Sequence, residues 1–338
     1  LNEKKIVSKG RLGPGEILGV RIEKGKVYSN DEIKNYLSKE YKHYNNQIID
    51  LDKKLEAETE KVELEGQSLR NFQHCFGYSI EDLELILHPM AEDAKEATGS
   101  MGDDTPLAVL SDKYRPLYHY FRQNFSQVTN PPIDSLRENK VMSLKTRFGN
   151  LGNILDFSKL TKDNIYVLNS PILSNAQFEK FLKFFGNNNK VLDCTFSKDD
   201  DLETSINLLK VKSEQAVREG IKQIILSDKN ISENRMPMPM LLCIGAINTH
   251  LVKLGLRGYV SINVQTGDAL DTHSFATLIG VGATTVNPYL AFDSLYQRHS
   301  KKLFGNFTFD ECVSRYIKSV NLGLLKIMSK MGISVLSS

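Results

Sequence analysis

The chain has 338 residues, which is enough to bury a large core in one big domain or in two. Its 43 lysines and arginines nearly balance its 41 aspartates and glutamates, and this argues against a nucleic-acid platform, which requires a basic stripe. No apolar run is long enough to span a bilayer, so we expect no membrane partner. The chain begins with Leu1, has no signal-peptide pattern and ends in what resembles the start of a strand, so we expect a piece of a longer polypeptide.

The cysteines are scattered and form no CxxC pair, so the sequence offers no ligand set for zinc or an iron–sulfur cluster. We interpret them as reduced thiols of a cytosol-like compartment, mostly in the core. They are Cys75, Cys194, Cys243 and Cys312.

The N-terminal part predicts a β hairpin followed by a helix. Residues 10–16 form a turn cluster, and strands over 17–22 and 26–28 can pair across Gly25. The cluster is only loosely similar to a phosphate loop, because no helix follows it. Asn30 and Asp31 can cap a helix that continues toward Leu55, and the charged residues 40–66 predict an exposed helix or linker.

Residues 79–149 predict helices. Ser79 to Asp82 is similar to a capping box, Pro89 can kink or end the helix that follows, and residues 135–149 read as helical again. Pro116 begins a segment whose aromatic residues at helical spacing predict core packing, with His119 as a structural histidine among them.

Two stiff polar loops, residues 99–106 and 127–134, flank the helical segment 107–125. The first has two glycines, carboxylates and a Thr-Pro pair, and the second has paired prolines that remove N–H donors and fix φ. Neither loop contains a nucleophile with a base beside it. They are either ordinary connections between helices or backbone shaped to line something.

From residue 164 onward, strands alternate with helices. This alternation predicts a parallel sheet with helices packed outside, either doubly wound or a (β/α) barrel, and the absence of a dinucleotide fingerprint favours the barrel-like form. The expected fold class is therefore α/β, a (β/α) barrel-like domain with a helical N-terminal portion and a short β hairpin. The expected strands are 164–168, 190–196, 221–226, 259–264 and 284–286, and the expected helices are 174–185, 200–219, 239–254, 272–279, 290–298 and 309–328.

Polar residues follow the expected strands at the ends where a (β/α) barrel carries its reactive groups. His273 with Asp228 or Asp268 could form an acid/base pair, which would make the chain a self-sufficient barrel enzyme. The same positions also need helix caps, and Ser227, Asp268 and Asp271 lie where caps are wanted. The residues alone leave both alternatives open.

Several motifs together resemble the central domain of glutamate synthase. They lie at residues 88–92, 99–111, 120–123, 127–134, 282–291 and 323–333, and the cluster at 10–16 is similar to the exit from that enzyme's amidotransferase domain. The likeness covers nearly the whole chain and is weakest over 30–72. It departs at 265–276, where Leu270 replaces an arginine and Ser274 replaces a histidine of the family.

The resemblance implies a parent enzyme in which one domain releases ammonia from L-glutamine. The ammonia then reaches a barrel with FMN and a 3Fe–4S cluster, where 2-oxoglutarate becomes L-glutamate. The expected partners are the amidotransferase and FMN domains of the same polypeptide, with ferredoxin or a small NAD(P)H-oxidising subunit as electron source. We expect no cofactor in this segment, no catalysis by it alone, and a location in the cytoplasm or plastid stroma.

The family's ammonia tunnel maps onto the two stiff loops. Neutral and apolar walls would keep ammonia unprotonated and away from water. The residues implied to line the tunnel are Met101, Thr129 and Asn130, and those implied to support the loops are Ser100, Gly102, Asp103, Asp104 and Pro131.

The resemblance also suggests domain boundaries. We expect the tail of the amidotransferase domain over 1–29, a helical linker over 30–72, the central barrel-like domain over 73–328 and the start of the FMN domain over 329–338. In a third reading, the long helices serve only to dock neighbouring domains.

Overall fold

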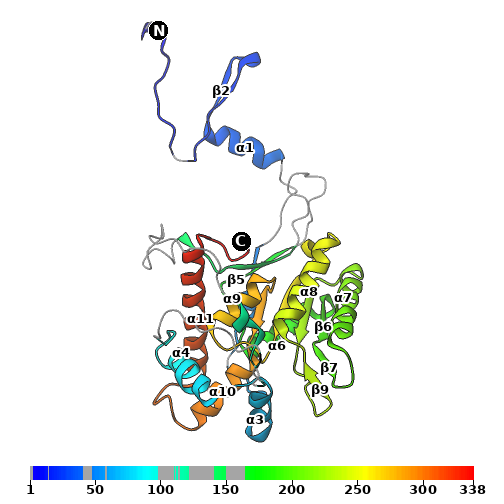
Figure 1. Cartoon of the computed structure of the whole chain (residues 1–338). Coiled ribbons are helices and arrows are strands. Elements are labelled where there is room, and N and C mark those ends of the chain that lie inside the picture. The colour runs from blue at the N-terminus through cyan, green and yellow to red at the C-terminus, as the bar shows by residue number, and fades with distance from the viewer. Residues whose placement is uncertain are drawn as a thin grey trace.

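The computed structural model describes residues 3–13, 15–40, 48–57, 59–97, 110, 112, 115–121, 141–149 and 164–338 (Figure 1). Both stiff loops therefore lie outside the described residues. This holds for Met101, Thr129 and Asn130, and for the supporting residues Ser100, Gly102, Asp103, Asp104 and Pro131.

The core of the molecule is a parallel sheet in the order β6-β8-β10-β11, as the alternation predicted. In register, Asp193 lies beside Ser227, Ser227 beside Gln265, and Gln265 beside Asn287. All residues of β8 and β10 are buried, which agrees with their central places in the sheet. The strands are β6 (Asn189–Asp193), β8 (Gln223–Ser227), β10 (Ser261–Gln265) and β11 (Thr285–Asn287).

A helix follows each of these strands, within two residues of the expected bounds: α7 (Leu202–Arg218), α8 (Met240–Lys253), α9 (Thr272–Gly280) and α10 (Tyr289–Ser300). The long α11 (Phe309–Met331) begins at a Thr308–Glu311 capping box and ends at Gly332, whose φ is 73°. Two short 3-10 turns, Gly186–Asn188 and Arg257–Tyr259, precede β6 and β10.

The first expected strand is not part of this sheet. β5 (Ile165–Leu168) instead pairs with β3 (Ile48–Asp50) in parallel and with β4 (Thr146–Phe148) in antiparallel fashion. A single parallel bridge from Ile172 to Val286 places the segment before α6 (Asn175–Phe185) beside β11. Within the described ranges no ladder joins that segment to β6, so closure of the barrel stays a prediction.

The expected strand 190–196 is two strands. β6 ends at Asp193, whose Oδ1 accepts hydrogen bonds from the Thr195 N–H at 2.9 Å and hydroxyl at 2.8 Å, and this turns the chain. β7 (Thr195–Ser197) then pairs antiparallel with β9 (Arg235–Pro237), and the Arg235 side chain bonds to both Asp193 and Thr195.

The expected exposed helix toward Leu55 is wrong. α1 (Asn30–Glu40) is followed in the described residues by β3 and the short α2 (Leu51–Leu55). Leu51 and Leu55 are fully buried in a cluster with Phe148, Phe181 and Phe185. These leucines lie four positions apart on one helical face, and that face packs against residues more than 90 positions away, which a local charge pattern does not show.

The hairpin is confirmed: β1 (Gly19–Arg21) pairs with β2 (Lys26–Tyr28) after a 3-10 turn over Ile22–Lys24, and Gly25 takes a φ of 58°. In Figure 1 the hairpin and α1 lie apart from the main body. A short 3-10 turn at Glu3–Lys5 precedes the hairpin in the chain.

The helical region after residue 65 is only partly as expected. α3 (Gly66–Cys75) precedes the Ser79–Asp82 capping box, which is formed, and a π-helical Asp82–Leu87 leads into α4 (His88–Glu92) with Pro89 near its start.

After Pro116 there is a 3-10 turn, Leu117–Tyr120, and Phe121 is extended. Tyr118 is buried there as expected, but Tyr120 and Phe121 are over 40% exposed and His119 is exposed too, so the expected core packing is confirmed at Tyr118 and wrong at Tyr120 and Phe121. Residues 146–148 form a strand rather than the expected helix, and their side chains alternate between buried and exposed with period two, as in a strand that has one face buried.

Candidate functional site

The carboxyl ends of β8, β10 and β11 lie together, as the barrel hypothesis required. Backbone hydrogen bonds continue beyond the strands, from the Asp228 N–H to the Gln265 carbonyl at 3.3 Å and from the Thr266 N–H to the Asn287 carbonyl at 3.0 Å. The polar residues that follow the strands therefore meet at one edge of the sheet, which is where an enzyme of this architecture would carry its site.

Asp228 is completely buried and its carboxylate is used as an acceptor. It accepts hydrogen bonds from the Thr266 hydroxyl at 2.5 Å, the Gly267 N–H at 3.2 Å and the Tyr289 hydroxyl at 3.0 Å. Burial raises the pKa of Asp228 to about 7, and these hydrogen bonds oppose the shift. Asp228 therefore ties β10 and α10 to the end of β8.

Asp268 is also buried, and burial raises its pKa to about 6. Hydrogen bonding from the backbone of Met240, the first residue of α8, opposes the shift, so Asp268 lies at the start of the neighbouring helix. One oxygen, Oδ1, has no hydrogen-bond partner. The cap of α9 is Asp271, whose carboxylate accepts from the Ser274 N–H at 2.9 Å.

The proposed acid/base pair is not formed. His273 stands in the first turn of α9, and its Nε2 lies 2.9 Å from the carbonyl oxygen of Tyr118. Asp228 and Asp268 are instead engaged with β10, α10 and α8. Ser227, expected as a cap, donates its hydroxyl to Gln265 Oε1 at 2.9 Å. The hypothesis of a stand-alone enzyme required His273 to pair with Asp228 or Asp268, and the structure does not bring these side chains together as a pair.

Residues 59–78 fill the space above these strand ends. The Tyr78 hydroxyl donates to the Gly267 carbonyl at 3.0 Å, and the Phe72 ring meets Tyr289 edge to face. Phe76 packs so closely on Gly267 that a Cβ added there would lie 2.4 Å from a ring carbon. We call this segment, residues 59–78, the cover segment.

Buried polar groups of α10 and α6 hold the cover segment in place. The Asp293 carboxylate accepts from the Glu63 N–H at 3.1 Å, the Leu64 N–H at 3.0 Å and Asn175 Nδ2 at 3.1 Å. Burial raises the pKa of Asp293 to about 7. Lys229, just after β8, pairs with the Glu63 side chain. Sequence reasoning missed this network, because no local motif marks a partner more than 100 residues away.

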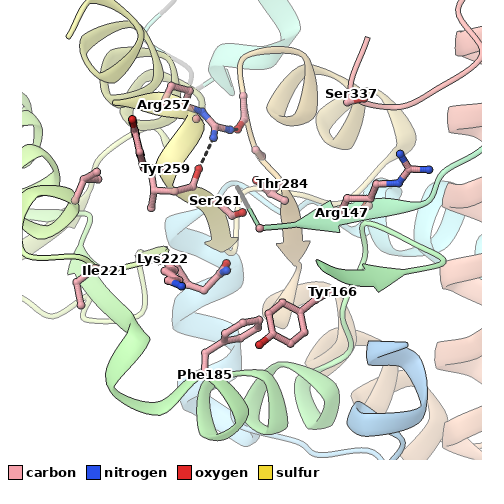
Figure 2. A pocket seen from close by; sticks show the side chains of 18 of the residues that line it. Arg147, Tyr166, Phe185, Ile221, Lys222, Arg257, Tyr259, Ser261, Thr284 and Ser337 are labelled. Atoms are coloured by element: carbon pink, nitrogen blue, oxygen red, sulfur yellow. Dashed lines mark hydrogen bonds between the residues drawn. The ribbon is translucent and has the colours of Figure 1, made fainter. Parts of the chain in front are cut away.

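A large cavity lies at the opposite end of the sheet (Figure 2). It has a volume of about 1090 Å³ and is lined by residues at the amino ends of β8, β10 and β11, including Gln223, Ser261 and Thr284. The deep pocket that a barrel enzyme needs at the carboxyl ends is thus replaced there by the cover segment.

Cys194, Cys243 and Cys312 are buried, as expected of core thiols, whereas Cys75 on α3 is exposed. Burial raises the pKa of the Cys312 thiol to about 11. In the described parts of the chain, no three His, Cys, Asp or Glu side chains gather to hold a metal ion. No helix there is long and apolar enough to cross a membrane.

Comparison with known families shows which family the chain matches. Residues 71–338 match the family described as glutamate synthase central domain, which is well over half of the chain. The chain belongs to the glutamate synthase central domain family. Residues 1–46 match a second family, glutamine amidotransferases class-II, so the piece before the central domain carries its own signature.

Curated glutamate synthases are similar over the whole chain. The NADPH-type large chain of Azospirillum brasilense is 47% identical over 346 residues, and that of Bacillus subtilis is 38% identical over 343 residues. The ferredoxin-dependent chloroplast enzyme of Spinacia oleracea is 38% identical over 361 residues. The chain covers 22–23% of the length of these relatives.

A solved structure of mutant flavocytochrome b2 has a TM-score of 0.30 and 14% identity, over 38% of this chain and 31% of that one. This likeness is too weak to support any argument about the protein.

Proposed function

We propose that this chain is the structural and ammonia-channelling segment of a glutamate synthase, placed between a glutamine amidotransferase site and an FMN site that makes L-glutamate from 2-oxoglutarate. The observation that carries the proposal is the adjacency of two family matches in one chain, amidotransferase over 1–46 and central domain over 71–338. A segment that contains the junction of two domains is suited to connect their sites.

The filled carboxyl end supports a connecting role rather than a catalytic one. Phe76 and Tyr78 occupy the space where a (β/α) barrel would hold a flavin, and Asp228 and Asp293 hold protein rather than a ligand. These residues do not fit FMN. We therefore assign FMN and the 3Fe–4S cluster of the parent enzyme to other domains, and the stand-alone barrel enzyme is disfavoured.

In this proposal, Met101, Thr129 and Asn130 line the ammonia passage, and the loop residues around them hold its shape. A passage walled by apolar and neutral polar groups disfavours ammonium, because charge is costly away from water. It also keeps water from competing for the intermediate. Met101 is flexible and apolar, which suits a gate.

The proposed partners are the amidotransferase and FMN domains of the same polypeptide, with ferredoxin or an NAD(P)H-oxidising subunit supplying electrons. The proposed location is the cytoplasm or the plastid stroma. The proposed boundaries are 1–29, 30–72, 73–328 and 329–338, although α2 at Leu51–Leu55 shows that part of the second piece packs into the core of the third.

A bulky substitution in the passage tests the proposal. In the full-length protein, Thr129→Phe should let glutamine hydrolysis continue while the glutamate formed per glutamine hydrolysed falls severalfold. Thr129→Ser, which keeps the hydroxyl and the small size, should preserve the ratio. An unchanged ratio in Thr129→Phe would contradict the channelling role, and flavin bound stoichiometrically to this chain alone would contradict its placement outside the flavin domain.

A further inference from the structure

A short 3-10 turn lies between the two stiff loops in the sequence. It comprises Leu117–Tyr120, and we call residues 116–121 the Tyr118 turn. The chain runs from the loop at 99–106 through this turn to the loop at 127–134. From Phe121 to the start of the second loop, the chain can span at most about 20 Å even when it is fully extended. The position of the Tyr118 turn therefore restricts where the second loop can begin.

The Tyr118 turn is attached to the rest of the molecule at two points. The Tyr118 side chain is buried in the main hydrophobic core. Its carbonyl oxygen lies 2.9 Å from His273 Nε2 and also accepts a hydrogen bond from the Phe121 N–H at 3.1 Å. A carbonyl oxygen has two lone pairs, so both bonds can form together. The buried ring alone would allow the turn to pivot about its side chain, and the bond from His273 fixes its orientation.

The first turn of α9 gives His273 a fixed base. Asp271 caps this helix by accepting from the Ser274 N–H at 2.9 Å, and the Ser274 hydroxyl donates to the Asp271 carbonyl at 2.6 Å. The Tyr316 hydroxyl of α11 donates to the Leu270 carbonyl at 2.7 Å, just before the cap. Because its base is held by the cap and by α11, the His273 side chain can impose a position on the Tyr118 turn.

α9 and α11 also contact the chain that leads into the first stiff loop. Arg315 of α11 donates from Nε to the Ala91 carbonyl at 2.9 Å, near the end of α4. Further along α11, a Cβ added to Gly323 would lie 2.6 Å from the Thr272 hydroxyl oxygen and 2.9 Å from a Glu96 carboxylate oxygen. The residues before the first loop and the turn after it therefore both rest on the same pair of helices.

We propose that His273 is a positioning residue for the ammonia passage, because its bond to the Tyr118 carbonyl fixes the turn between the two stiff loops. The inference rests on the channelling function proposed above. His273 acts through the backbone of the Tyr118 turn rather than by touching ammonia. Without this bond the turn can shift, and a shift that opens the passage lets ammonia escape to water before it reacts.

Two substitutions of His273 in the full-length protein test the positioning step. His273→Leu removes the donor, whereas His273→Gln can place an amide N–H near the position of Nε2. His273 is exposed, so neither change opens a cavity in the core. Backbone amide exchange of residues 116–121, measured by mass spectrometry, should become about fivefold faster in His273→Leu, because one hydrogen bond is lost. In His273→Gln it should stay close to the parent rate.

The functional measurement is the glutamate formed per glutamine hydrolysed. In His273→Leu this ratio should fall about twofold to fivefold while glutamine hydrolysis continues at the parent rate, and His273→Gln should restore the ratio. A purely structural role would lower glutamine hydrolysis and glutamate formation together, so the ratio separates positioning from general loss of stability.

His299→Leu is a matched control, because His299 makes the same kind of bond elsewhere. Its Nε2 lies 2.9 Å from the Phe307 carbonyl oxygen, between α10 and α11, in a segment that joins neither stiff loop. This variant should speed exchange around Phe307 and leave both the Tyr118 turn and the ratio unchanged. An equal fall of the ratio in His299→Leu would overturn the proposal, because any lost bond of this kind would then have the same effect.

Two further outcomes would overturn the proposal. One is unchanged amide exchange of residues 116–121 in His273→Leu. The other is an unchanged ratio in His273→Leu. If Thr129→Phe still lowers the ratio in that case, channelling stands without a role for His273. If Thr129→Phe leaves the ratio unchanged as well, the channelling function fails and the role of His273 fails with it.

Discussion

The two ends of the central sheet are built from the same strands but carry opposite features. At the carboxyl end, Asp228, Asp268 and Asp293 are buried and the cover segment packs above them. At the amino end, Lys222 and Arg257 line a cavity, and its lining within the described part of the chain includes no aspartate or glutamate. One end of the sheet is therefore filled with protein and acidic, and the other is open and basic.

Helix direction accounts for part of this difference. In a parallel sheet the helices begin near the carboxyl ends of the strands and end near the amino ends. Helix N-termini favour negative groups and C-termini favour positive ones, each with about half a unit charge. Asp268 meets the start of α8 and Asp271 caps α9, as this predicts. Lys222 and Arg257 precede β8 and β10, on the side of the sheet where the helices end.

The largest expected effect comes from the close contact at the filled end. Gly267→Ala places a Cβ 2.4 Å from the Phe76 ring, so the ring must move and the cover segment must loosen. We expect a loss of about 3 kcal/mol in the free energy of unfolding, measured by urea denaturation. Gly258→Ala, which lines the open cavity and has no atom within 4 Å of its added Cβ, should cost less than about 0.5 kcal/mol. Equal costs at the two glycines would contradict the contrast between the ends.

The buried carboxylates predict a specific pH dependence. Because the folded-state pKa of Asp293, about 7, lies above its unfolded value of 3.8, the folded state binds more protons between these values. Stability from this group is therefore fully present below pH 3.8 and is lost as pH rises through 7. Between pH 5 and 8 the free energy of unfolding of the parent chain should fall by about 2 kcal/mol more than that of Asp293→Asn. Urea denaturation at each pH measures this difference. Parallel pH profiles would show that Asp293 does not titrate this way.

A smaller effect should follow from the hydroxyl that bridges α10 and β8. Tyr289→Phe removes the donor 3.0 Å from Asp228 Oδ1 and leaves a buried carboxylate short of a partner. We expect a cost of about 1.5 kcal/mol in the free energy of unfolding. Tyr259→Phe, at a tyrosine that lines the open cavity and is 60% exposed, should cost almost nothing. If Tyr289→Phe were equally neutral, the network around Asp228 would not hold the filled end together.

The sequence by itself determined the elements that depend on nearby residues. The helix expected at 174–185 is α6 with its Ser174 cap, and the hairpin turns at Gly25 as its pattern predicted. Periodicity, caps and turns act over a few residues, so one sequence displays them. The motifs of the central domain were also readable, because they identify a family without requiring contacts.

Tertiary structure alone decided how distant segments pair. β5 pairs with β3 and β4 rather than with the central sheet. Leu51 is buried in a hydrophobic cluster, although the charged residues around it in the sequence predict an exposed segment. Glu63 of the cover segment pairs with Lys229 across 166 positions at the carboxyl end of the sheet. A polar residue at a strand end can serve a catalytic site or a buried network equally well. What settles the choice is which segment packs above it, and that depends on contacts between residues far apart in the chain.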